Sequence, residues 1–183
     1  MAPPTTGGSL LIGPGGVNEV VAMRPLLPPG PIATLSAHEP EVVAIRGACE
    51  PWATPYSGDM HDMPFSDATF DYVFCSNVGE HATSPIAMLM EVRRVMKDGA
   101  KAHFILPSFA GVEGGVGLLH WFCMPQECWV ELMRKCGLLV VDTQIEQGTA
   151  EANNGFYMHF RIVAGALPHP YGALMARIKE LRT

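Results

Sequence analysis

Short apolar runs separated by polar turns recur along the chain. The run at 70–75 (FDYVFC) is apolar at every position except Asp71. A run of this kind is typical of a strand that is buried on both faces of a parallel sheet. Shorter runs at 9–12 (SLLI) and 102–106 (AHFIL) predict two further strands.

The clearest predicted helix follows the run at 70–75. Ser84 is expected to cap it, with Pro85 at its first position, and Gly99 to end it. Its inner face comprises four apolar residues: Ile86, Leu89, Val92 and Met96. Its solvent face is predicted to comprise four charged residues: Glu91, Arg93, Arg94 and Lys97. An earlier helix, starting near Asn18, is expected to break or end near Pro25.

The second strand has two candidate positions. Residues 31–37 (PIATLSA) could be the strand, with a helix opening at Glu39, or residues 42–45 could be the strand. The segment at 41–46 echoes the segment at 19–24, which is predicted to be helical. We therefore favour residues 31–37.

The last third of the chain predicts a hairpin and two helices. Strand-like segments at 138–146 and 156–163 are separated by the turn signal at 153–155 (NNG). These two strands are expected to pair in antiparallel fashion. The helices are predicted at 126–136 and 171–182.

The composition is that of a globular protein. Of the 183 residues, 48% are hydrophobic and 16% are charged, so residues 1–183 are expected to form a single domain. The net charge of −6 argues against a nucleic-acid partner, because such proteins usually carry a basic stripe. No apolar run reaches the ~18 residues of a membrane span. The start, MAPPTTGGS, lacks the pattern of a signal peptide, so we predict a cytoplasmic protein.

The cysteines are odd in number and lie in apolar runs: Cys49, Cys75, Cys123, Cys128 and Cys136. Buried free thiols in a reducing compartment are the simplest interpretation. Cys123 and Cys128 lack the close spacing of a zinc site. Asp59, His61 and Asp62 could also be considered as metal ligands, but three ligands crowded into one turn rarely close a site. We therefore expect no bound metal.

Polar residues gather where the predicted strands end. Ser76 and Asn77 end the run at 70–75, and Glu80 and His81 lie just beyond. A glycine-rich turn at 13–16 (GPGG) follows the first strand in the same way. Because ligands of open α/β sheets collect at the carboxyl ends of the strands, these residues are expected to share one binding edge.

Several of these motifs together resemble one enzyme family. Residues 58–81 (GDMHDMPFSDATFDYVFCSNVGEH) are similar to the middle of class I S-adenosylmethionine-dependent methyltransferases. Their pattern there reads Gly-Asp-x-x-x-Leu-Pro-Phe, then Phe-Asp-x-Val, then Glu-His. Residues 91–99 (EVRRVMKDG) resemble that family's Glu-x-x-Arg-Val-Leu-Lys-Pro-Gly, with Asp98 in place of proline. The resemblance, to a methyltransferase type 11-like domain, is strong over about 56–107.

The resemblance implies a fold and a cofactor. The fold is an α/β, Rossmann-like three-layer α/β/α sandwich with a mostly parallel seven-stranded sheet and an antiparallel last strand. The cofactor is S-adenosylmethionine. Asp59 would accept the adenine amino group and the Met60 N–H would donate to the ring; alternatively, Asp59 only caps its own turn. The other cofactor contacts that the resemblance implies are Gly13, Pro14, Gly15, Gly16, His61, Ser76, Asn77 and Val78.

The chain departs from the family around the cofactor. Leu11 stands where the family usually has an acid, and Val17 where it has a third glycine. The second strand of the family normally ends in an acid that binds the ribose hydroxyl groups. The two candidate strands here end in residues 36–37 (SA) and in Arg46, neither of them acidic. Glu39 is the nearest substitute if residues 31–37 form the strand.

His81 is the predicted catalytic residue. A neutral imidazole near the methyl group could take a proton from a hydroxyl or amine. Alternatively, His81 only anchors its loop, since methyl transfer often needs positioning alone. His120, Trp121 and Phe122 could line a substrate pocket, although packing in the core is the favoured interpretation for the two aromatic residues.

Two functions follow from these observations. We predict an S-adenosylmethionine-dependent methyltransferase whose acceptor, a small molecule or a macromolecule, is unidentified. The chain has little room for a cap over a small-molecule pocket, so the acceptor could be large, or a partner or second copy could complete the site. The alternative is a non-catalytic methyltransferase-like binding module, which the missing ribose acid would suit.

Overall fold

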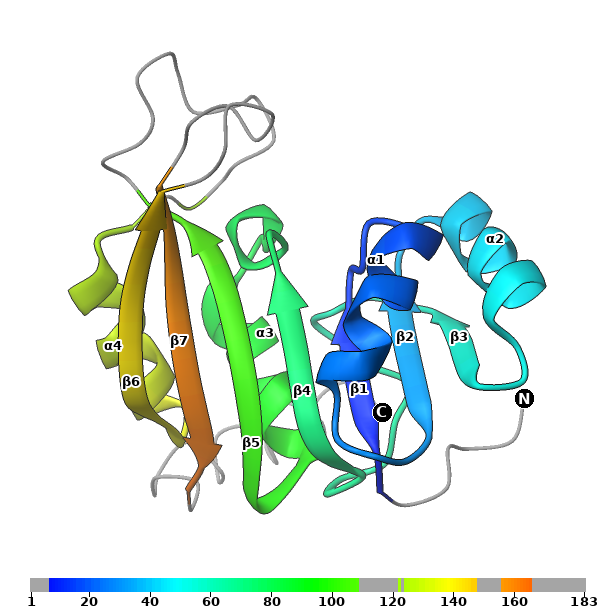
Figure 1. The fold of residues 1–183 in the computed structure, drawn as a ribbon. Coiled ribbons are helices and arrows are strands. Elements are labelled where there is room, and N and C mark those ends of the chain that lie inside the picture. Colours follow the sequence, from blue (N-terminus) through cyan, green and yellow to red (C-terminus); the bar gives the residue numbers. More distant parts are fainter. Residues whose placement is uncertain (1–6, 109–121, 123, 148–155, 166–183) are drawn as a thin grey trace.

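The computed structural model describes residues 7–108, 122, 124–147 and 156–165 (Figure 1). They form one seven-stranded sheet with the order β3-β2-β1-β4-β5-β7-β6. The strands are β1 (Ser9–Ile12), β2 (Ile32–Ser36), β3 (Ala53–Ser57), β4 (Phe70–Ser76), β5 (Met96–Pro107), β6 (Leu138–Gln147) and β7 (Phe156–Ala164). The helices are α1 (Val17–Met23), α2 (Glu39–Cys49), α3 (Pro85–Val95) and α4 (Gln126–Lys135), with short 3-10 helices η1 (Arg24–Leu26) and η2 (Gly79–His81).

The strand directions confirm the predicted sheet. Neighbours are parallel from β3 through β2, β1 and β4 to β5. β7 lies between β5 and β6 and is antiparallel to both. The predicted pairing of the two last strands is therefore correct, with Leu138 opposite Ala164. The turn predicted at 153–155 lies outside the described residues.

The structure also decides between the two candidates for the second strand. β2 falls within residues 31–37 and is buried at every position. Residues 42–45, the other candidate, lie inside α2. There Val42 and Ile45 are buried while Val43 is exposed, which is the three-residue spacing of a helix with one buried face.

Helices cover both faces of the sheet, as the predicted three-layer sandwich requires (Figure 1). Consecutive residues of β1 point to opposite layers, because side chains alternate along a strand. Leu10 and Ile12 pack in the larger core cluster, which includes Met88 of α3 and Trp129 of α4. Leu11 packs in the smaller cluster, against residues of α1 and α2.

The prediction for α3 is wrong in three respects. The helix ends at Val95 rather than at Gly99, because Met96 already begins β5 and lies opposite Phe70 of β4. Ile86, placed on the inner face, is exposed. Glu91 and Arg93, expected to face solvent, are buried.

Hydrogen bonds to distant parts of the chain explain why the two charged residues of α3 are buried. The Arg93 guanidinium donates to the carbonyl oxygens of Gly165 and Met96 and pairs with Asp98. Glu91 accepts from the Met63 N–H at 2.9 Å and is also paired within α3. Buried charges persist when they are paired and hydrogen-bonded in this way.

Asp71 has a structural role at the entry to β4. Its carboxylate accepts from the Gly8 N–H at 3.0 Å and pairs with Lys97 at 2.7 Å. Both contacts favour the charged form, so they lower the pKa of Asp71.

The cysteine prediction needs one correction, because Cys128 is exposed; Cys49, Cys75 and Cys136 are buried free thiols.

Some predictions fall on residues outside the described ranges: the helix at 171–182, Cys123, His120 and Trp121. Phe122 is described and packs against the larger core cluster, as the favoured interpretation expects. None of the helices in the described part of the chain is long and apolar enough to cross a bilayer.

Candidate functional site

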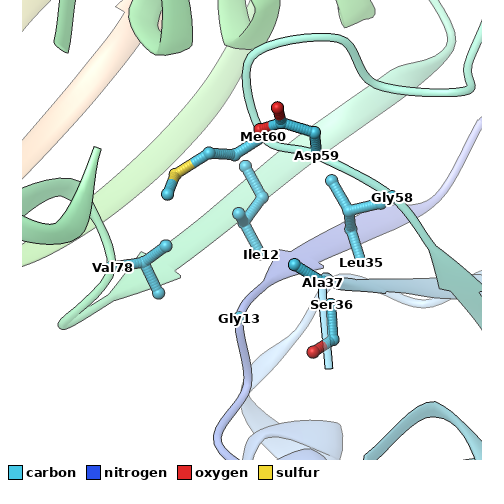
Figure 2. Close-up of a pocket in the computed structure, with 9 residues that line it drawn as sticks. All are labelled: Ile12, Gly13, Leu35, Ser36, Ala37, Gly58, Asp59, Met60 and Val78. Carbon is cyan, nitrogen blue, oxygen red and sulfur yellow. The ribbon is translucent and has the colours of Figure 1, made fainter. Parts of the chain in front are cut away.

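The centre of the sheet carries a cavity at the carboxyl ends of the strands (Figure 2). β1 lies between β2, which follows it in sequence, and β4, so the strand order switches direction there. Ligands of open α/β sheets bind at such a switch point. The cavity has a volume of about 100 Å³, whereas a single water molecule needs only ~10–15 Å³. It is lined by Ile12, Gly13, Leu35, Ser36, Ala37, Gly58, Asp59, Met60 and Val78.

The lining is mainly apolar, with a few polar groups at its margin. Figure 2 shows the side chains of Ile12, Leu35 and Val78 around one space, with the Met60 side chain beside them. Small-molecule sites usually have this character, because apolar walls supply affinity and a few polar groups supply orientation. Of the predicted cofactor residues, Gly13, Asp59, Met60 and Val78 line the cavity.

Gly13 closes one side of the cavity with bare backbone. Its φ of +57° lies in the left-handed region. A Cβ atom built on it would lie 2.4 Å from Cγ2 of Val78, so only glycine fits there. The Gly13 N–H also donates to the carbonyl of Leu35 at 2.8 Å, which ties the end of β1 to the end of β2.

The rest of the glycine turn leads into α1. Gly15 and Gly16 have φ values of +68° and +133°, which favour glycine. In the described part of the chain, nothing lies within 4 Å of a Cβ atom built on Gly16. Val17, which stands where the resemblance implies a third glycine, is the first residue of α1. Pro14, Gly15 and Gly16 lie beside the cavity residue Gly13 but do not line the cavity itself.

A hydrogen-bonded chain holds the turn that carries Asp59. The Asp59 Oδ1 atom accepts from the His61 N–H at 2.9 Å and lies 2.6 Å from Nδ1 of the same residue. His61 Nε2 accepts from the Ser84 N–H, at the start of α3, at 3.3 Å. These contacts place the ring proton on Nδ1. Hydrogen bonding by His61 lowers the pKa of Asp59 and keeps it a carboxylate.

The turn after β4 supplies the opposite wall. Asn77 has a φ of +50°, and its N–H donates to the carbonyl of Ile105 at 2.9 Å. Its side-chain amide donates to Ser76 Oγ at 3.3 Å. This turn directs Val78 into the cavity, whereas Ser76 and Asn77 lie at the same sheet edge without lining it.

Glu80 and His81 follow in η2, outside the cavity lining. Glu80 is 1% exposed, and its Oε2 atom is buried with no hydrogen-bond partner among the described residues. Burial raises the pKa of Glu80, which favours the neutral acid. His81 is partly exposed, and its Nε2 atom lies 3.9 Å from Glu80 Oε1, beyond normal hydrogen-bond distance. The structure thus places His81 on the ligand edge of the sheet, one turn beyond Val78.

The end of β2 carries a polar pair that the sequence did not reveal. Ser36 Oγ donates to Glu41 Oε2 at 2.6 Å and accepts from the His38 N–H at 3.0 Å. The acid that contacts the strand end is therefore Glu41, whereas Glu39, the substitute suggested by the sequence, is exposed. Ser36 itself lines the cavity.

Five cavity residues were not predicted from the sequence: Ile12, Leu35, Ser36, Ala37 and Gly58. Their position relative to the predicted strands could have identified them. Four lie at or just after the ends of β1 and β2, and Gly58 follows β3 directly. Among the described residues, no three His, Cys, Asp or Glu side chains come together to hold a metal ion.

The fold and the cavity together define a class of protein. The sheet has four parallel and two antiparallel neighbour pairs of strands, with a glycine turn beside a cavity at the switch point. This is the class I methyltransferase fold. A profile of the methyltransferase domain family matches residues 12–104, which is just over half of the 183 residues. The chain belongs to this family.

Solved structures share the fold at low sequence identity. A Haloferax volcanii protein described as a methyltransferase, in complex with the Trm112 methyltransferase activator, has 18% identity and a TM-score of 0.74, over 90% of this chain and 85% of that one. A protein from Listeria monocytogenes, described as S-adenosylmethionine-dependent methyltransferase, has 10% identity and a TM-score of 0.71, over 91% and 95%. The [4+2]-cyclase SpnF has 14% identity and a TM-score of 0.72, over 88% and 76%. A comparison with curated proteins gives no match.

Proposed function

We propose that this protein is an S-adenosylmethionine-dependent methyltransferase. The observation that carries the proposal is the apolar cavity between the ends of β1, β2 and β4, with the bare backbone of Gly13 on one side and Asp59 on another. A flat apolar ring with a polar edge, such as adenine, fits a space of this chemistry. Residues 1–183 would form one methyltransferase-like domain around it.

Each predicted contact follows from the chemistry of the group it would meet. Ile12, Leu35 and Val78 would pack against the adenine ring. The Asp59 carboxylate would accept from the adenine amino group and the Met60 N–H would donate to the ring, because that edge of adenine offers both a donor and an acceptor. The glycine turn would bring backbone groups close to the amino-acid end of the cofactor. His61 holds Asp59 in place.

The chain would contribute positioning and one proton transfer. The chemistry that the cofactor supplies when bound is an electrophilic methyl group on a sulfonium sulfur. The glycine turn and the cavity would align this group with the acceptor and exclude water from it. We propose that His81 takes the proton that the acceptor's hydroxyl or amine loses as its oxygen or nitrogen forms the new bond to carbon. The acceptor remains unidentified.

A partner protein is proposed as an alternative way to complete the site. The Haloferax volcanii relative was solved in complex with an activator, and the same arrangement here would leave the acceptor side of the cavity to be built at an interface. A non-catalytic binding module is the rival function. The [4+2]-cyclase SpnF carries a different activity on the same fold.

Calorimetry with S-adenosylhomocysteine tests the cofactor assignment. We expect binding tighter than about 1 mM, weakened by about 1–3 kcal/mol in Asp59→Ala through the loss of a hydrogen bond. His81→Ala is the matched control, because His81 does not line the cavity and its removal should leave the affinity unchanged. Absence of binding at millimolar ligand by folded protein would refute the assignment.

A further inference from the structure

The turn that carries Asp59 is closed by its own backbone, but its carboxylate is open to solvent. The Asp62 N–H donates to the Asp59 carbonyl at 3.1 Å, which closes the turn. Asp59 lines the cavity, and its side chain is 65% exposed. An exposed carboxylate can rotate, so a ligand that binds it has to fix its orientation. Contacts that fix the carboxylate beforehand therefore strengthen binding.

Two donors from one residue hold the same oxygen of Asp59. Its Oδ1 atom accepts from the backbone N–H of His61 at 2.9 Å and lies 2.6 Å from Nδ1 of the His61 ring. The backbone contact is usual in an aspartate turn, whereas the short ring contact depends on the side chain at position 61. The Oδ2 atom of Asp59 has no partner among the described residues, so it is the oxygen left to a ligand.

The His61 ring is itself anchored on α3. Its side chain is 17% exposed, and Nε2 accepts from the Ser84 N–H at 3.3 Å. Ser84 caps α3, with its hydroxyl oxygen accepting from the Ala87 N–H. Because Nε2 is an acceptor, the ring proton lies on Nδ1, the nitrogen that contacts Asp59. The start of α3 therefore fixes both the position of the ring and the nitrogen that donates.

The same helix holds the rest of the loop without the help of His61. Glu91 accepts from the Met63 N–H at 2.9 Å, and Arg94 donates to the Met63 carbonyl at 3.0 Å. Loss of the His61 ring would leave these contacts in place, so the loop would stay attached to α3. The effect of such a loss should therefore fall on the Asp59 carboxylate rather than on the loop as a whole.

We propose that His61 is a positioning residue for the adenosyl cofactor. It would not touch the cofactor but would orient the Asp59 carboxylate that accepts from the adenine amino group. This inference rests on the proposed function. The sequence placed His61 among the direct cofactor contacts, but it does not line the cavity. Its effect on binding would pass through Asp59, because it fixes Oδ1 before the ligand arrives and leaves Oδ2 to the ligand.

A double-mutant cycle with S-adenosylhomocysteine tests the inference. Calorimetry would measure its affinity for the unmodified protein, His61→Leu, Asp59→Ala and the double variant. We expect His61→Leu to weaken binding by about three- to tenfold, the loss that corresponds to releasing one oriented side chain. When Asp59→Ala is already present, the same change should alter the affinity by less than about twofold, because His61 then has no carboxylate to orient.

Two amide variants separate the roles of the two ring nitrogens. Asparagine can place an N–H near the position of Nδ1, so His61→Asn should keep the affinity within about twofold of the unmodified protein. Glutamine reaches instead to the position of Nε2, so His61→Gln should bind as weakly as His61→Leu. The opposite order would overturn the inference, because the contact with Ser84 would then be the one that matters.

His159→Leu is the matched control. The His159 side chain is 19% exposed and lies 3.3 Å from Glu146, which is 63% exposed, so the pair resembles His61 and Asp59. It lies on β6 and β7, outside the cavity lining, and its loss should leave the affinity unchanged. Thermal melts verify that each variant is folded.

Two results would overturn the inference while the proposed function stands. One is an unchanged affinity in His61→Leu, and the other is an equal loss with and without Asp59, which would mean that His61 only supports the loop. If the folded, unmodified protein does not bind S-adenosylhomocysteine, the inference and the proposed function are both overturned.

Discussion

Replacing Arg94 by alanine should lower the free energy of unfolding far more than the loss of a surface charge would. The Arg94 guanidinium donates to both oxygens of Glu91 at 2.7 Å. It also donates to the carbonyls of Met63 and Phe65, at 3.0 Å and 2.6 Å. Arg94 therefore joins α3 to the loop between β3 and β4, which carries Asp59.

The magnitude follows from what the substitution leaves behind. The Glu91 side chain is 5% exposed. Without Arg94 it would be a buried carboxylate whose one remaining partner among the described residues is the Met63 N–H. Removing one member of a buried ion pair typically costs about 3–5 kcal/mol. For a domain of this length, each 1 kcal/mol lowers the melting temperature by roughly 2–4 °C, so we expect a fall of about 10 °C.

The chain contains a matched control for this experiment. Glu131 and Arg134 have the same spacing on α4 as Glu91 and Arg94 on α3, but their side chains are 48% and 61% exposed. Arg134→Ala should therefore destabilise the protein much less than Arg94→Ala, because an exposed ion pair contributes little. Urea denaturation followed by circular dichroism measures both. Equal losses in the two variants would refute the reasoning, because burial would then make no difference.

Two further predictions follow from backbone geometry and from burial. Gly13→Ala should abolish binding of S-adenosylhomocysteine and destabilise the fold, because the added Cβ would meet Val78 at 2.4 Å. Adding Val78→Ala to this variant should restore part of the stability in a thermal melt. If the melting temperature does not recover, the steric explanation is contradicted. A maleimide reagent should label Cys128 in the folded protein, because it is exposed, and peptide mapping should find the three buried thiols protected until the chain unfolds: Cys49, Cys75 and Cys136. Burial also raises the pKa of Cys136 to about 11, which keeps its reactive thiolate scarce; rapid labelling of any of the three would argue against a buried position.

Much of the architecture could be predicted from the sequence because it depends on local patterns. The apolar run at 70–75 and the shorter ones before and after it predicted strands where β4, β1 and β5 are found. Ser84 caps α3 as expected, with its side chain accepting from the Ala87 N–H. The motif order identified the family, and the family profile matches. These features need only neighbouring residues to be recognised.

Other features depend on contacts between distant parts of the chain. The sequence placed Glu91 and Arg93 in solvent, because charged residues on a helix usually lie there. Both are buried, because the loop at Met63 and the backbone at Gly165 offer them hydrogen bonds. The end of α3 was misjudged for a similar reason, since Met96 pairs with Phe70 in the sheet.

The binding edge shows the same division. The sequence by itself predicted that the glycine turn and Asp59 lie at this edge, because the motifs follow one another in the order and spacing of the family that they resemble. Gly13 and Asp59 do line the cavity. Only the tertiary structure decided that Ile12 and Leu35 wall the cavity and that Glu41 folds back onto Ser36. The physical reason is that a cavity and a buried hydrogen bond belong to the packing of several strands and helices at once. No single segment encodes them.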